Sequence, residues 1–183
     1  MEQEASTQEV VESAQRAERR PRDMVISMLV LLVPILLAFG VYRVFFNGHD
    51  PIRVDQSAAI DDARHSGVFP VLTPVELPAG WTPVSSAWQR VDGGWILRLG
   101  FVSPGGDGAQ VMQSDADATS IIPAELTREA RPQGTTEVGG TPWEIYSTRP
   151  GEHALVRLDP DRTVIVVGAA AQADLVDLAT TLS

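Results

Sequence analysis

The longest apolar run of the chain lies near its N-terminus. Nineteen residues from Met24 to Tyr42 carry no charged side chain, and the run continues through Arg43 to Phe46 for 23 residues in all. An α-helix rises about 1.5 Å per residue, so this run is long enough for a hydrocarbon core of about 30 Å. We therefore predict a transmembrane helix over residues 24–46.

A cleaved signal peptide is the alternative explanation of this run. Signal peptides have an apolar core of about 7–15 residues that ends at small residues. Here the core is longer, and it ends in Phe45-Phe46-Asn47-Gly48-His49-Asp50, which has no small-x-small pattern. We therefore predict an uncleaved, single-pass anchor in contact with the lipid bilayer through residues 24–46.

The arginines around this run predict its orientation. Four of them precede it, at positions 16, 19, 20 and 22, whereas only Arg53 and Arg64 follow within about 20 residues. Positively charged flanks stay in the cytoplasm. The sequence therefore predicts a disordered cytoplasmic tail over residues 1–23, a juxtamembrane linker over 47–53 and an extracytoplasmic domain over 54–183, held at the plasma membrane.

After the anchor, the periodicity changes to that of strands. Trp95, Leu97, Leu99 and Phe101 share one face of a predicted strand, with Ile96 and Arg98 on the other. Similar patterns predict further strands over residues 83–91, 109–114, 143–146, 154–158 and 163–167. The run Thr163–Val167 is apolar on both faces after its first residue and indicates a central strand.

Three helical segments accompany these strands. Residues 55–67 form a short helix that Asp55 can cap and Gly67 can end. Residues 115–130 are compatible with a helix broken at Pro123, and residues 171–182 with an amphipathic helix whose apolar stripe is Leu175, Leu178, Ala179 and Leu182. We predict an α+β fold: a mainly antiparallel β-sheet with the C-terminal helix packed on one face.

An ordered set of sequence marks carries a family resemblance. The marks are Leu77-Pro-Ala-Gly-Trp81, the strand Trp95 to Phe101, Gly139-Gly-Thr-Pro-Trp143, and Val166-Val-Gly-Ala-Ala170 before an amphipathic helix. With the single anchor, they resemble an actinobacterial family of membrane-anchored proteins of unknown function. The resemblance covers residues 24–183 and implies a layout without an activity.

Charge and composition narrow the function classes. Residues 47–183 hold 18 acids against nine arginines, and an acidic surface repels phosphate backbones, so nucleic-acid binding is not expected. The chain has no cysteine, which excludes disulfides and thiolate chemistry. Its 14 basic residues are all arginine. We interpret this as a coding bias.

The candidate chemistry is sparse. His49, His65 and His153 stand outside any recognised catalytic motif, and the acid pairs Asp115/Asp117 and Asp159/Asp161 lack the further oxygens that calcium needs. Turn and cap roles explain these acids. The glycines at 105–108 lack the Lys-Ser/Thr of a phosphate loop. We predict no catalytic residue, metal site or cofactor, and the protein is not expected to be an enzyme.

Four tryptophans remain as possible contact residues: Trp81, Trp88, Trp95 and Trp143. Small sheets use tryptophan mainly to fill the core, yet a cluster can also bind lipids, glycans or peptides. Trp81 follows a Pro/Gly-rich approach and is expected to be the most exposed. Trp81 and Trp88 are the candidate contacts to a ligand or partner.

Three hypotheses of function follow. The first is an interaction or ligand-binding domain tethered in the cell envelope, with an envelope protein or lipid as partner. The second is a carrier or sensor for a lipid or cell-wall precursor, with an apolar groove between sheet and helix. The third is a hydrolase with an unrecognised carboxylate site, which would need two acids facing each other across a cleft.

Overall fold

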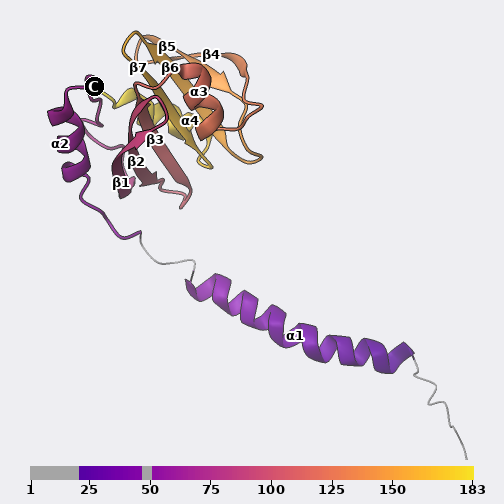
Figure 1. The fold of residues 1–183 in the computed structure, drawn as a ribbon. Coiled ribbons are helices and arrows are strands. Elements are labelled where there is room, and N and C mark those ends of the chain that lie inside the picture. Colours follow the sequence, from indigo (N-terminus) through magenta and orange to yellow (C-terminus); the bar gives the residue numbers. More distant parts are fainter. Residues whose placement is uncertain (1–20, 47–50) are drawn as a thin grey trace, which may run out of the picture. The chain divides into compact units, whose positions relative to one another are not determined.

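A computed structural model describes residues 21–46 and 51–183 of the chain (Figure 1). Contacts divide the chain into two units with a boundary between Asp50 and Pro51. The predicted tail over residues 1–23, apart from its last three residues, lies outside the described residues, as do His49 and residues 47–50 of the predicted linker. The two units are described separately below.

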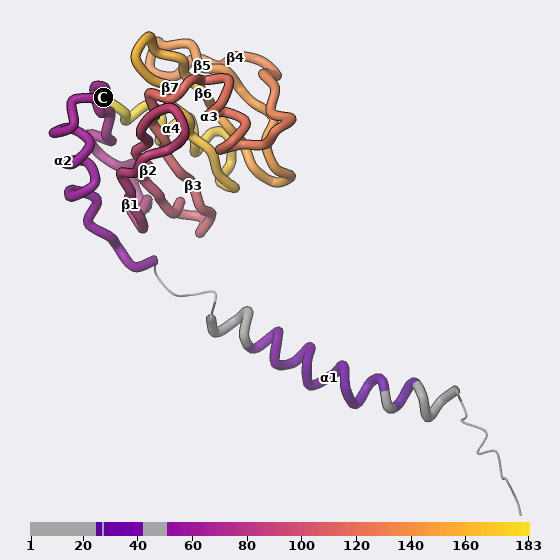
Figure 2. Tube along the Cα trace, in the orientation of Figure 1, coloured from indigo at the N-terminus to yellow at the C-terminus, as the bar shows by residue number. Residues whose placement is uncertain are grey.

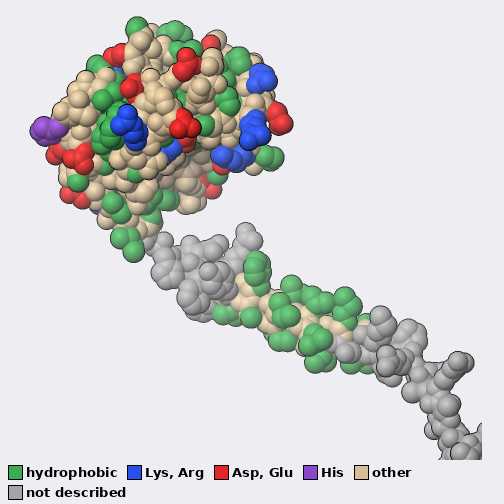
Figure 3. All heavy atoms as spheres, in the orientation of Figure 1, with side chains coloured by type: hydrophobic (Ala, Val, Ile, Leu, Met, Phe, Trp, Pro, Cys, Tyr) green, Lys and Arg blue, Asp and Glu red, His purple; other side chains and the backbone are tan. Residues whose placement is uncertain are grey.

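Helix α1, Pro21–Phe46, forms the first unit and covers the whole predicted anchor. The large apolar side chains described on it are between 37% (Leu32) and 66% (Leu31) exposed, and Figure 3 shows them along its surface. Within the described part of the chain, no helix is both long and apolar enough to count as a membrane span. Several side chains near the ends of the predicted span lie outside that description, and the anchor stays a prediction.

The second unit is built on a seven-stranded sheet in the order β1-β2-β3-β7-β6-β5-β4, in which every neighbouring pair is antiparallel. Strands β1 to β3 form one meander and β4 to β7 a second, and the two join along β3 and β7. The strands are β1 Thr82–Val91, β2 Gly94–Val102, β3 Gly108–Ser114, β4 Pro132–Val138, β5 Thr141–Tyr146, β6 His153–Asp159 and β7 Arg162–Gly168. The α+β prediction is confirmed, and β7 is central as expected.

Three short helices pack on this sheet: α2 Ser57–Ser66, α3 Ala118–Glu125 and α4 Gln172–Thr180. The Ser57 amide donates to the Asp55 carboxylate at 2.9 Å, and Gly67 ends α2 in the left-handed conformation at φ 64°. The Asp117 carboxylate caps α3 by accepting from the Thr119 amide at 2.8 Å. These local bonds satisfy helix-end donors that have no partner within the helix.

The first face of the sheet carries the larger core. Leu97, Leu99 and Val166 lie there, fully buried under α2 and α4. The predicted apolar stripe of the C-terminal helix packs into this cluster, with Leu175 and Leu178 both at 0% exposure. The prediction that this helix covers one face of the sheet is therefore confirmed.

An extended segment, residues 68–81, completes the cover of the first face; the trace in Figure 2 follows it from α2 into β1. Its centre is held by Gln113 of β3, whose buried amide donates to the Leu72 carbonyl at 2.7 Å and accepts from the Leu72 amide at 2.8 Å. Thr73 and Ser183 exchange two backbone hydrogen bonds, at 3.1 and 3.2 Å. This segment is therefore fixed both to the sheet and to the end of the chain.

The second face is also covered in part, by α3. Ile96, Met112, Val156 and Ile165 point to this face and pack with the buried Ile121 and Ile122 of the helix. Strands that are apolar on both faces need cover on both. The expectation of a sheet with one covered face is thus incomplete, because residues 115–131 cover a second one.

Candidate functional site

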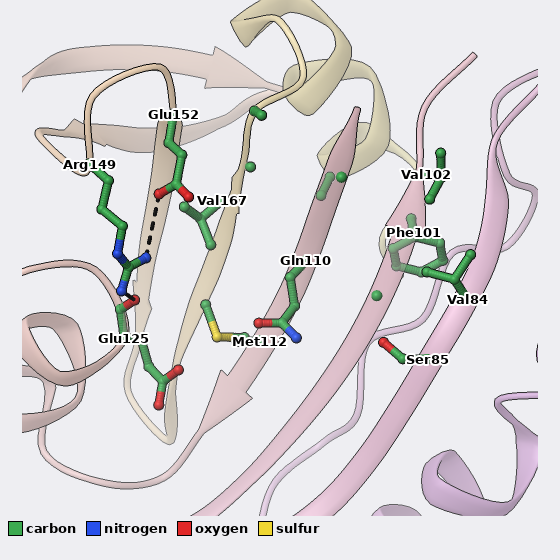
Figure 4. A pocket seen from close by; sticks show the side chains of 15 residues that line it. Val84, Ser85, Phe101, Val102, Gln110, Met112, Glu125, Arg149, Glu152 and Val167 are labelled. Atoms are coloured by element: carbon green, nitrogen blue, oxygen red, sulfur yellow. Dashed lines mark hydrogen bonds and ion pairs between the residues drawn. The ribbon is translucent and has the colours of Figure 1, made fainter. Parts of the chain in front are cut away.

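An open groove of about 450 Å³ lies on the second face, beside the part that α3 covers. It crosses β7, β3, β2 and β1 in turn, and Figure 4 shows its lining side chains from Arg149 and Glu152 at one end to Val84 and Val102 at the other. Binding sites for small molecules have volumes of about 300–1,000 Å³. The groove is thus large enough to be a site.

Gly100 of β2 keeps the floor of the groove low. It lies opposite Ser85 of β1 in the antiparallel register. A Cβ at Gly100 would lie 2.2 Å from the Ser85 hydroxyl oxygen, so a larger residue would displace Ser85 or raise the floor. Glycine inside a strand is often found where another group must approach the backbone closely.

Ion pairs form the polar end of the groove. The Arg98 guanidinium donates to the Glu125 carboxylate at 2.5 Å, and both side chains are mostly buried. Glu152 accepts from the Thr148 hydroxyl at 3.2 Å and pairs with Arg149 at 3.4 Å. Both carboxylates that line the groove are therefore engaged by arginine.

Arg149 is the most accessible cation of this end. Its side chain is 54% exposed, and its contacts to the Glu152 carboxylate and the Glu125 carbonyl are long, at 3.4 and 3.5 Å. A guanidinium has five donors and binds carboxylates and phosphates in pairs of hydrogen bonds. Arg149 thus retains the capacity to bind an anionic group.

The opposite end of the groove lies where the chain enters the domain. The Val54 amide donates to the Pro83 carbonyl at 2.8 Å. The Gln56 side-chain amide donates to the carbonyls of Ser85, at 2.7 Å, and Gly100, at 3.1 Å, and both of these residues line the groove. The segment that follows the predicted anchor is therefore bonded directly to the apolar end.

The tryptophans lie elsewhere. Trp81 is only 4% exposed and belongs to the core of the first face, so the expectation that it is the most exposed tryptophan is wrong. The approach to Trp81 folds back onto the sheet, which covers the ring. Trp88 is half-buried; it stacks on Trp95 at 5.1 Å between ring centroids and meets Phe69 edge-on at 5.8 Å. Neither candidate contact residue lines the groove.

Three of the other titratable candidates have local structural roles. His65 bonds the Asp61 carbonyl within α2, and Asp159 pairs with Arg157 and Arg162 at 2.7 and 2.9 Å. Hydrogen bonds from the Thr119 hydroxyl and amide hold the pKa of Asp117 below its usual range. Within the residues described, no three side chains of the metal-binding types gather in one place.

Sequence reasoning did not find the groove. Gly100 interrupts an otherwise apolar strand, and Arg98 lies two residues before it on the same face as Ile96. Both residues indicate locally that this face of the strand is not fully covered by the core. The groove itself depends on how far α3 extends over the sheet, which is a tertiary property.

Comparison with protein families gives a match over most of the chain. A family model described as "Protein of unknown function (DUF4245)" matches residues 16–182. No curated protein matches the chain. The matched range includes both residues 24–46 and the sheet domain.

Proposed function

The chain belongs to the DUF4245 family of proteins of unknown function, so we propose a function from the groove itself. We propose that the protein is a membrane-anchored, extracytoplasmic domain that binds a ligand or partner in the cell envelope. The open groove on the second face is the observation that carries this proposal. It combines a low, mainly apolar floor, in which Ser85 and Gln110 are polar, with engaged charged groups at one end, and a mainly apolar lining with a few polar groups is usual for a binding site.

The membrane part of the proposal rests on residues 24–46. Their length and apolarity suit a bilayer, and the four arginines before them favour a cytoplasmic N-terminus. A phosphatase fused after Ser183 should be active outside the cytoplasm. An expressed fusion that is inactive there would contradict this orientation.

A binding role fits the groove better than a hydrolytic one. A hydrolase of the carboxylate type needs an acid free to donate a proton and a second carboxylate free to act as base or nucleophile. Glu125 and Glu152 are each bonded to an arginine, so neither carboxylate of the groove is free for such a role. The alternative of a lipid or cell-wall-precursor carrier would use this same groove.

A photo-crosslinking residue at position 102 tests the binding role in intact cells. Irradiation should give an adduct with an envelope molecule, and Gln110→Trp in the same chain should suppress it by filling the floor. The same crosslinker at Asp62, which is exposed on α2, is the matched control. Equal adducts at both positions, unaffected by Gln110→Trp, would reject the groove as a binding site.

A further inference from the structure

We infer that the occupant of the groove is one acyl chain of an anionic membrane lipid, with its headgroup at Arg149 and its chain directed across the sheet toward Val84. This inference rests on the proposed function and names the ligand of that site. Three features of the groove support it. They are the change in polarity along the groove, the main-chain hydrogen bonding between the strands of its floor, and the short connection to the predicted anchor.

The polarity of the groove changes along its length. Arg149 and Glu152 stand at one end, Gln110 and Met112 lie in the middle, and Val84 and Val102 lie at the other end, where the small hydroxyl of Ser85 is the one labelled polar side chain (Figure 4). A ligand that matches this gradient has a polar or charged group at one end and a hydrocarbon chain at the other. That is the chemistry of a lipid.

The floor offers few free main-chain groups. It crosses β2, β3 and β7, whose backbones are paired with a neighbouring strand on both sides, and it reaches the edge strand β1 where the register shifts around Val84. A peptide ligand binds an extended surface largely through main-chain hydrogen bonds, which a sheet offers at its edges and not on its face. A hydrocarbon chain needs no such bonds, so this floor suits an acyl chain better than a peptide.

The charge of the polar end selects the headgroup. Although residues 47–183 hold twice as many acids as arginines, Arg149 is half-exposed and bound only through long contacts. Arg98, bonded to the groove-lining Glu125, has a buried Nη1 that lacks a hydrogen-bond acceptor among the described atoms. A phosphate or carboxylate at this end would give Arg149, the arginine that lines the groove, an acceptor for its remaining donors.

The connection between the predicted anchor and the domain is short. The predicted span ends at Phe46, and the chain is bonded to the apolar end of the groove from Val54 onward. Eight residues reach at most about 28 Å when fully extended. A domain tethered to the proposed anchor by so short a connection has membrane lipid available as a ligand.

The full-length protein in vesicles tests this inference. The vesicles contain phosphatidylcholine with phosphatidylglycerol, and the probe is phosphatidylglycerol with a diazirine in one acyl chain. After irradiation, mass spectrometry should locate adducts on peptides that contain Val84, Val102 or Met112. Val102→Glu should reduce these adducts about tenfold or more, because it puts a charge on the apolar floor.

Two controls make the outcome specific. Val75→Glu is the matched variant, because Val75 is 77% exposed outside the groove, and it should leave the adducts unchanged. Arg149→Gln should lower the preference for labelled phosphatidylglycerol over labelled phosphatidylcholine about tenfold, through loss of a charge-assisted hydrogen bond. Arg64→Gln on α2, outside the groove, should leave this headgroup preference unchanged.

Adducts confined to residues 24–46, or an unchanged headgroup preference in Arg149→Gln, would overturn the inference. If the crosslinker at position 102 then captures a protein in a manner that Gln110→Trp abolishes, the groove is a binding site for a protein and the proposed function survives without the lipid. If neither the lipid probe labels the groove nor the crosslinker at position 102 captures a molecule, the inference and the proposed function are both rejected.

Discussion

Replacing Gln113 should destabilise the sheet domain far more than a surface substitution does. Its side chain is fully buried and satisfies both main-chain groups of Leu72 at 2.7 and 2.8 Å. Gln113→Leu has a similar volume but bonds neither group. Each buried polar group left unsatisfied costs about 1–3 kcal/mol, and partial access of water reduces this, so we expect a loss of about 2–4 kcal/mol.

Urea denaturation of residues 51–183 measures this loss. The matched control is Gln89→Leu, which changes an exposed glutamine of β1 and should stay within about 0.5 kcal/mol of the wild type. A Gln113→Leu variant as stable as this control would refute the reasoning. It would mean that the extended segment is held by its other contacts alone.

Gln113→Glu adds a pH dependence with a defined sign. Burial raises the pKa of the new carboxyl above that of the unfolded chain, about 4.3. The folded state then binds the proton more tightly, so the penalty is full above the folded pKa and falls as the pH drops through it. A neutral carboxyl can also donate to the Leu72 carbonyl as the amide does. The stability deficit of this variant should therefore shrink toward pH 4, and a deficit that grows would contradict the burial of this site.

Three further outcomes follow from the fold. Residues 51–183 should fold without the anchor, because they form their own compact unit; a cooperative melt with a mixed α/β circular dichroism spectrum checks this, and a disordered spectrum would contradict it. Leu178→Ala should cost about 2–5 kcal/mol in urea melts, since it opens a cavity at a fully buried position, whereas the exposed Asp177→Ala should change stability by less than about 0.5 kcal/mol. Arg98→Met should destabilise by about 1–3 kcal/mol in the same assay, because it leaves Glu125 partly buried without its partner, and an unchanged midpoint would show that solvent replaces the pair.

Sequence patterns predicted the elements in which the order of apolar and polar residues shows which side chains are buried. The alternation in β2 separated Leu97 and Leu99 from Ile96 and Arg98, and the structure places the two sets on opposite faces. Strand β7 was correctly placed at the centre, because a strand covered on both sides has no polar face.

Features without a local pattern of apolar residues were not predicted. Strand β4, Pro132–Val138, is mostly exposed and polar because it lies at the edge of the sheet, so it shows no alternation. The burial of Trp81 depends on residues 68–81 folding back, which the Gln113 bonds and the pairing of Pro74 with Leu182 secure. The groove was missed for the same reason, since it is the part of the second face that α3 leaves open.

The division of the sheet into two meanders also shapes how the domain reaches its native state. Among the strands described, the seam between β3 and β7 is the one pairing of strands that are not consecutive in the chain. The hairpins of each meander close short loops and can form in about 1–10 μs, whereas the seam must close a loop of roughly 50 residues. Joining the two meanders is therefore expected to set the folding rate. Changes at Val111 or Val166, which face each other across this seam, would slow folding, while changes in the outer hairpins would mainly speed unfolding.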